Sequence, residues 1–364
     1  MDKRNGDRNM SVIKNIRKFW ERFEDEQGSL ENALQTKDYP KINEIVAGLN
    51  EEANAVSGCS FFVEDVDQDF ELTLDPGPNK TSQYIAQRMK IMAPDNVKKN
   101  WRINDSLQPL SQKAIEAAVQ IKDETYTLAD LYVFYEIHPQ SQTFGTKIYC
   151  PGYQLIDNDE YTKEMSMYLL ELAIGQTDYE AYISSVEPLT APLADTKDFC
   201  PLVDFYSLIQ ETIEKEKWKE YTSPLDIYSI YEPNQDFAHD SLRKDMKIIF
   251  TTHPMLVEET LGEKNDVLLD LKAKEGEYGY VYYANPFSGK DNALFRQELS
   301  RQLDETLSRL NLGKVIGGAM GKSFSYIDWI VFDPEGFEKA FEQIKKQLDP
   351  KVELHYVTFH EFMN

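Results

Sequence analysis

The sequence predicts an α+β protein of two domains, each an α/β sandwich in which helices cover a sheet. Segments with helical periodicity alternate with segments in which every second residue is apolar, so both kinds of element are expected. The chain has 364 residues, of which 41% are hydrophobic, enough for more than one core. Residues 223–240 are rich in Pro, Asp, Asn and Tyr, which indicates a linker. The predicted domains are therefore residues 1–222 and 241–364.

The N-terminal domain is expected to begin with two helices. Apolar residues fall on one face of residues 11–27, and a second amphipathic segment starts at Tyr39. The period then changes. Residues 60–66 and 69–75 are β-rich runs joined by a short acidic turn, which predicts a hairpin.

The rest of the N-terminal domain mixes helices and strands. Helical periodicity is found in residues 81–92 and 159–175. The later part of residues 192–221 is also helical, with acids early and lysines late, as the helix dipole favours. Apolar alternation predicts strands at residues 101–107, 127–138, 143–152 and 179–189.

The C-terminal domain has the clearest pattern. A strand at residues 246–254 and a helix at 255–276 come first. From Glu277 the order is strand, helix, strand, strand, helix, strand. This βαββαβ order is the ferredoxin-like split motif, with helices on one face of an antiparallel sheet. The motif is expected to comprise strands 277–286, 313–320, 324–332 and 351–359 and helices 292–311 and 334–349.

Charge and cysteine content exclude several functions. With 63 acidic and 39 basic residues the net charge is -24, which repels phosphate backbones and anionic lipid and would suit a basic partner. No nucleic-acid or membrane binding is therefore expected.

The N-terminus lacks the apolar core of a secretion signal, and the sequence offers no membrane span. The sequence has three cysteines, which lie far apart: Cys59, Cys150 and Cys200. Because an odd number of cysteines cannot all pair within one chain, a reducing compartment is favoured. The sequence therefore predicts a cytoplasmic protein.

Residues 317–323, GGAMGKS, look like a phosphate-binding loop. That loop requires the pattern G-x-x-x-x-G-K-[ST], and Ile316 stands where its first glycine should be. The loop must also enter a helix, whereas the residues from Phe324 alternate as in a strand. The stretch is therefore predicted to be a glycine-rich turn between two strands.

Weaker candidate sites are left. Bare glycine amides beside Lys322 and Ser323 could dock an anion or a peptide. Asp328 lies among apolar residues, where a charge needs a partner and often has a shifted pKa. His253 ends a predicted strand and could meet His239. The ordinary alternatives are a satisfied buried Asp and a surface His. The candidate residues for ligand or partner docking are Gly317, Gly318, Gly321, Lys322, Ser323, Asp328 and His253.

The sequence has no recognised motif for a metal, a cofactor or a nucleophile. Residues 65–76 begin like a calcium loop, but Phe70 and Pro76 occupy its glycine and glutamate positions. An acidic hairpin turn is the better interpretation. There is no HExxH and no G-x-S-x-G. We expect no catalytic residue, no metal and no cofactor.

Three segments together resemble an uncharacterised family of bacterial proteins. They are FWERF at 19–23, CPLVDFYSLIQ at 200–210 and KVIGGAMGKSFSYIDWIVFD at 314–333. The family begins with an FWxWF-like helix and ends with a GGxxGxxYxYID-like strand pair. Here Arg22 replaces the second Trp. The family has no established activity, so the resemblance implies the architecture and no site residues.

Three functions are open on this basis. The first is a non-catalytic interaction or regulatory protein, of an accessory or immunity type, that binds another protein. The second is a small-ligand binding or sensing protein, which rests on fold analogy alone. The third is an enzyme with an unrecognised site. The missing nucleophile, metal and phosphate motifs favour the first.

Overall fold

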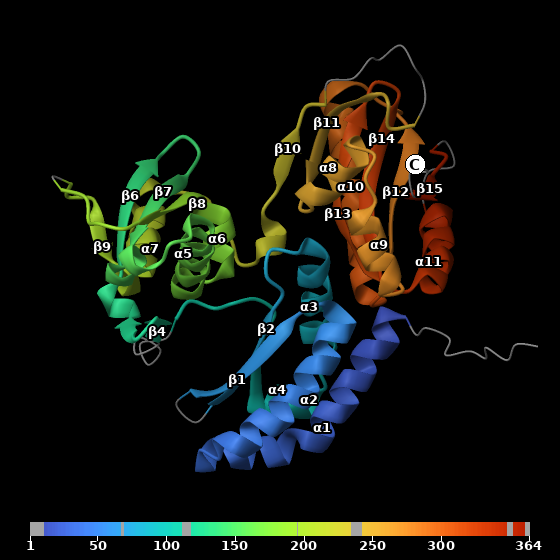
Figure 1. Ribbon diagram of the computed structural model, residues 1–364. Coiled ribbons are helices and arrows are strands. Elements are labelled where there is room, and N and C mark those ends of the chain that lie inside the picture. Colours follow the sequence, from blue (N-terminus) through green and yellow to red (C-terminus); the bar gives the residue numbers. More distant parts are fainter. Residues whose placement is uncertain are drawn as a thin grey trace, which may run out of the picture. The chain divides into compact units, whose positions relative to one another are not determined.

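The computed structural model describes residues 11–66, 69–110, 118–194, 196–233, 242–347 and 352–360. Helices and strands are mixed throughout these ranges, which confirms the predicted α+β class. The chain forms two compact units, each built from separate stretches of sequence (Figure 1). Unit 1 comprises Met1–Ser60, Pro78–Lys99 and Tyr228–Asn364, and unit 2 comprises Phe61–Gly77 and Asn100–Ile227. None of the helices in the described ranges is both long enough and apolar enough to cross a membrane.

Unit 1 contains a six-stranded sheet and helices from both ends of the chain. Its helices are α1 (Val12–Thr36), α2 (Tyr39–Ser57), α3 (Lys80–Met92), α4 (Asp95–Asn100), α8 (Pro254–Leu261), α9 (Asp266–Ala273), α10 (Gly289–Arg309) and α11 (Pro334–Gln347). Its strands are β10 (Ser229–Tyr231), β11 (Met246–Thr251), β12 (Glu277–Ala284), β13 (Gly313–Gly321), β14 (Phe324–Val331) and β15 (His355–Thr358).

The division into units differs from the predicted domains 1–222 and 241–364. The difference arises in the first hundred residues, whose helices pack within unit 1. Trp20 of α1 donates to the Met89 carbonyl of α3 at 2.9 Å. Arg88 of α3 donates to the carbonyl of Gly313 in β13 at 3.1 Å. Periodicity predicted these helices, but it carries no information about which sheet they pack against.

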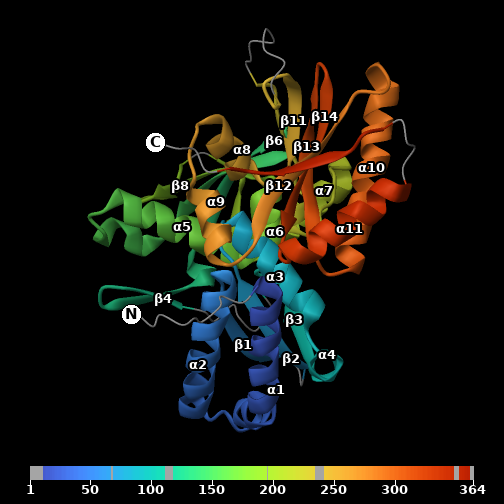
Figure 2. The same ribbon diagram turned by 90° about the vertical axis from the view of Figure 1, so that its right-hand side faces the viewer.

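The sheet of unit 1 has the order β10-β11-β13-β14-β12-β15, and every neighbouring pair is antiparallel. Figure 2 shows α10 and α11 on one side of this sheet, here called face A, and α8 and α9 on the other, face B. Val281, Ile327 and Trp329 are among the residues of the face A core. Ile249 and Tyr326 belong to the core on face B.

The helix predicted at 255–276 is two helices, α8 and α9. They are separated at Gly262–Asn265, where Glu263 takes the left-handed conformation with φ 55°. A single continuous helix cannot contain such a residue. The strand predicted at 246–254 is also shorter, because it ends at Thr251 and the chain turns into α8.

Among its described residues, unit 2 contains three small sheets. Its helices are α5 (Asp159–Ile174), α6 (Gln176–Tyr182) and α7 (Phe205–Glu216). Its strands are β1 (Ser60–Val66), β2 (Asp69–Asp75), β3 (Trp101–Asn104), β4 (Ala118–Ile121), β5 (Glu124–Thr127), β6 (Tyr132–His138), β7 (Thr143–Tyr149), β8 (Ile183–Leu189) and β9 (Phe199–Pro201). The sheet orders are β1-β2-β3, β4-β5 and β8-β7-β6-β9.

Local signals explain several elements of unit 2. The hairpin predicted at residues 60–75 is β1 and β2; the middle of its turn, with Asp67, lies outside the described residues. Asn158 caps α5 through its side chain, and Gly175 ends the helix with φ 81°, a conformation that glycine adopts readily. The core of this unit includes Phe144, Phe205 and Trp218.

Candidate functional site

The glycine pair lies inside β13, not in the turn that follows it. A Cβ on Gly317 would stand 2.2 Å from the carbonyl oxygen of Phe250 on the neighbouring strand. A Cβ on Gly318 would stand 2.2 Å from the carbonyl oxygen of Tyr326 on the other side. The two glycines therefore permit a close approach of three strands, which any side chain would prevent.

An internal carboxylate holds the turn between β13 and β14. Asp245 accepts hydrogen bonds from the backbone N–H of Ser323 at 2.8 Å and of Phe324 at 3.0 Å. Its own carbonyl accepts from the N–H of Lys322 at 2.9 Å. A Cβ on Gly321 would stand 2.3 Å from the Asp245 carboxylate. The amides of the turn that follows the predicted glycines thus bind a carboxylate of the protein itself.

Asp328 has the partner that a buried charge needs. It is 1% exposed and accepts from Nη1 and Nη2 of Arg243 at 2.6 and 3.3 Å. The guanidinium carbon lies 4.9 Å from the ring centroids of Tyr280 and Phe359 and 5.5 Å from that of Tyr326. Two-point pairing and aromatic contact both stabilise a guanidinium at low exposure.

His253 is buried rather than on the surface, with 1% exposure. Its Nδ1 accepts from the N–H of Leu256, at 3.2 Å, and so caps α8. Burial, together with the charge of Lys80, lowers the pKa of His253 to about 3, so the ring is neutral. Nε2 then carries the hydrogen and donates to the Tyr278 hydroxyl at 2.9 Å. His239, its predicted neighbour, lies outside the described residues.

The structure brings some of the predicted residues together. Gly317 and Asp328 are cross-strand partners, while Lys322 and Ser323 surround Asp245. His253 belongs to a separate set of hydrogen bonds at the start of α8. None of the seven candidates lines the hollows described next.

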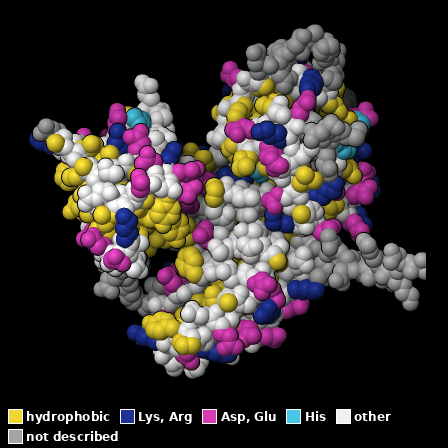
Figure 3. Space-filling view, viewed as in Figure 1, with side chains coloured by type: hydrophobic (Ala, Val, Ile, Leu, Met, Phe, Trp, Pro, Cys, Tyr) yellow, Lys and Arg dark blue, Asp and Glu magenta, His cyan; other side chains and the backbone are white. Residues whose placement is uncertain are grey.

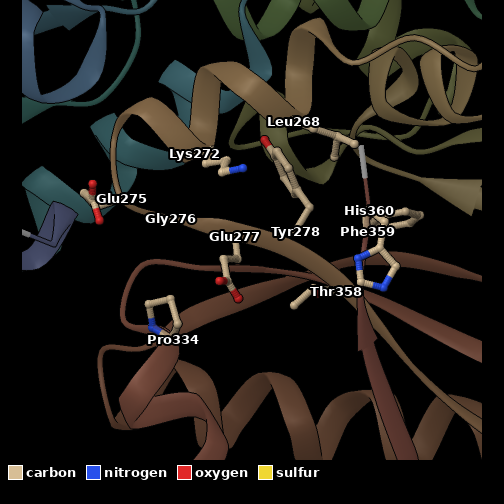
Figure 4. A pocket seen from close by; sticks show the side chains of 10 residues that line it. All are labelled: Leu268, Lys272, Glu275, Gly276, Glu277, Tyr278, Pro334, Thr358, Phe359 and His360. Carbon is tan, nitrogen blue, oxygen red and sulfur yellow. The ribbon is translucent and has the colours of Figure 1, made fainter. Parts of the chain in front are cut away.

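A hollow of about 410 Å³ lies where β12 begins and β15 ends. Figure 4 shows Lys272 of α9 on one side of it and Glu277 and Pro334 on the other, with His360 above Thr358. A lysine, two carboxylates and an imidazole therefore border this one space.

A second hollow, of about 540 Å³, continues along β15 on the side of α11. It shares Glu277, Pro334, Thr358 and His360 with the first hollow, and we call the two together the β15 groove. The other residues that line the second hollow are Glu335, Phe337, Glu338, Tyr356 and Val357.

The β15 groove is predominantly acidic. The glutamates that line it are Glu275, Glu277, Glu335 and Glu338, and Lys272 lines the same space with the opposite charge. Burial raises the pKa of Glu277, an effect that Lys272 opposes. A carboxylate that resists ionisation when desolvated is stabilised by an added cation. Acidic side chains are spread widely over the face in Figure 3, in keeping with the net charge of -24.

The backbone of β15 leaves hydrogen-bonding groups on its outer side. The N–H of Phe359 donates to the Tyr278 carbonyl at 2.9 Å, which fixes the phase of the ladder between β15 and β12. Hydrogen-bonded pairs alternate in antiparallel strands, so Val357 faces β12 while the N–H and C=O of Tyr356 and Thr358 point outward. β15 is the last strand of the sheet, and no strand in the described ranges pairs with its outer edge.

Sequence reasoning did not identify this groove, although one signal was available. The final strand of a βαββαβ motif lies at a sheet edge, so the edge position of residues 351–359 followed from the predicted order. The lining carboxylates look like ordinary surface acids in the sequence. Among the described residues, no group of three His, Cys, Asp or Glu side chains is placed to hold a metal ion.

Comparison with known proteins found no matching family, no similar curated protein and no similar solved structure.

Proposed function

We propose that this protein binds another protein by taking an extended, basic segment of its partner as an additional strand on β15. The open edge of β15 beside an acidic groove is the observation that carries this proposal. In strand addition, backbone hydrogen bonds give affinity and pockets for alternate side chains give specificity. Tyr356 and Thr358 would supply the backbone donors and acceptors.

The groove also defines the sequence of the partner segment. Side chains of an added strand alternate between the two faces of the sheet. Those on the α11 side would meet Glu277, Glu335 and Glu338. The segment therefore carries Lys or Arg at every second position over the four residues that β15 spans. The net charge of -24 would speed the encounter with a basic partner.

We also propose a ferredoxin-like sandwich in unit 1, a relation to the bacterial family described above, and a cytosolic location. Strands β15-β12-β14-β13 with helices α10 and α11 on one face have the order of a ferredoxin-like sandwich, which β11 and β10 extend. The likeness to the bacterial family with the FWxWF-like helix is part of this proposal. A reducing, cytosolic location agrees with the free thiols of Cys59, Cys150 and Cys200.

Fluorescence anisotropy with labelled peptides tests the proposal. A peptide with lysines at alternate positions should bind, and the binding should weaken as salt is raised. The matched control peptide has the same composition with its lysines consecutive. Equal binding of the two peptides would contradict strand addition.

Charge reversal locates the site. Glu335→Lys with Glu338→Lys, both exposed on α11, should weaken binding of the alternating peptide at least tenfold, because two attractive contacts become repulsive. Glu211→Lys with Glu214→Lys, both exposed on α7 of unit 2, makes the same change in net charge away from the groove. The proposal fails if the two double variants lose affinity equally.

A further inference from the structure

Buried polar atoms without hydrogen-bond partners gather beneath α10, on face A. Tyr283 is 0% exposed and Asn292 is 3% exposed. Among the described residues nothing bonds to Oδ1 of Asn292 or to Nε and Nη1 of Arg296, and the Tyr283 hydroxyl, near the Ser325 side chain, has no partner with good hydrogen-bond geometry. Native proteins leave few such groups unsatisfied, and each one is costly.

These atoms belong to one cluster. Asn292 and Arg296 are one helical turn apart on the same side of α10. Nδ2 of Asn292 donates to Oγ of Ser325 at 3.0 Å, and Ser325 is the direct cross-strand partner of Tyr283. Burial raises the pKa of Tyr283 to about 12, while Ser325 and Arg296 beside it act in the opposite direction.

The cation of this cluster lies over an aromatic ring. The guanidinium carbon of Arg296 is 4.0 Å from the ring centroid of Phe250. Across the strands, Gly318 is the register partner of Phe250 and places no side chain beside that ring. In the described part of the chain no carboxylate forms an ion pair with Arg296. Arg296 is partly buried, with Nε and Nη1 shielded from solvent, and a desolvated cation without a paired anion is unfavourable.

We infer that Arg296, Tyr283 and Asn292 form a binding site for a small carboxylate that also carries a hydrogen-bond donor. Arg296 and the Tyr283 hydroxyl would donate to the carboxylate oxygens, and Oδ1 of Asn292 would accept from a hydroxyl or an ammonium group. Phe250 and Phe295, whose ring lies 5.5 Å from that of Tyr283, form apolar walls. An α-hydroxy or α-amino acid has this combination of groups. The site does not depend on the β15 groove.

NMR of the full chain tests this site directly through the Nε–H signal of Arg296. The probes are glycolate and glycine, with acetate and inorganic phosphate as controls at equal ionic strength. Glycolate or glycine should shift the signal in a saturable way. Acetate should bind about tenfold more weakly, because it lacks the donor for Asn292.

Two variants assign the binding to this cluster. Tyr283→Phe removes one hydroxyl at constant shape and should weaken the preferred probe about tenfold. Arg296→Met should abolish its binding, and the wild-type titration still decides the matter if this variant does not fold. Three results would overturn the inference: no saturable shift with any carboxylate, equal response to phosphate, or binding that Tyr283→Phe leaves unchanged.

Discussion

Arg243 and Asp328 form a buried two-point ion pair between residues 85 positions apart in the sequence, with N–O distances of 2.6 and 3.3 Å. Arg243 belongs to the segment that leads into β11, and Asp328 lies in the middle of β14. Arg243 also has a left-handed backbone, with φ 64°, which is unfavourable for a non-glycine residue. The ion pair and the surrounding aromatic rings therefore compensate for local strain and hold this segment against face B.

Removing one partner of this pair should be strongly destabilising. Asp328→Asn leaves the guanidinium without its counter-charge, and we expect the free energy of unfolding to fall by about 3–5 kcal/mol. Denaturant titration measures it. The double variant Arg243→Met with Asp328→Leu removes both charges and should recover a large part of the loss. A single variant as stable as the wild type would show that the pair does not hold the segment.

Two glycines should respond oppositely to alanine. Gly321→Ala would place a Cβ within 2.3 Å of the Asp245 carboxylate, and we expect a loss of about 1–3 kcal/mol in unfolding free energy. Gly28, inside α1, has nothing within 4 Å of its ideal Cβ. Gly28→Ala should therefore stabilise the protein by about 0.5–1 kcal/mol. If Gly321→Ala is neutral in thermal or denaturant unfolding, the turn is not held as described.

His253 should make stability depend on pH. Its pKa is about 3 in the folded protein, against an ordinary value of 6.5. Between these values the unfolded chain binds a proton that the folded protein does not, so the unfolding free energy decreases as pH falls below 6.5. The slope for one proton is about 1.4 kcal/mol per pH unit. Above pH 6.5 the contribution of His253 to the unfolding free energy is fully present.

Comparison of variants isolates the part of the pH dependence that comes from His253. In His253→Asn the pH dependence of unfolding should lose this slope, while the Asn side chain can still cap α8. His138→Gln, in unit 2, removes a histidine elsewhere and should leave the slope in place. The same pH dependence in wild type and His253→Asn would contradict a neutral, buried His253.

Local patterns predicted the elements well where their period was strong. The alternation after Phe324 predicted a strand at 324–332, and β14 is Phe324–Val331. The same alternation excluded a phosphate loop. The helix predicted at residues 159–175 is α5, which ends at Ile174 because Gly175 takes a positive φ. These features depend on a few neighbouring residues.

Contacts between distant segments could not be predicted in this way. Asp245 reaches the turn of β13 and β14 from nearly eighty residues away, so the amides of that turn looked free in the sequence. Asp328 was recognised as needing a partner, but nothing in the pattern pointed to Arg243. The carboxylates of the β15 groove acquire their meaning only from the sheet order, which places β15 at an edge.

Amide hydrogen exchange of β15, followed by NMR, tests the central claim most directly. The N–H groups of Tyr356 and Thr358 point outward, whereas that of Val357 is bonded to β12. Addition of the alternating-lysine peptide should slow exchange at Tyr356 and Thr358 by tenfold or more and change Val357 little. A peptide that binds while both outward amides exchange as before would contradict strand addition on β15.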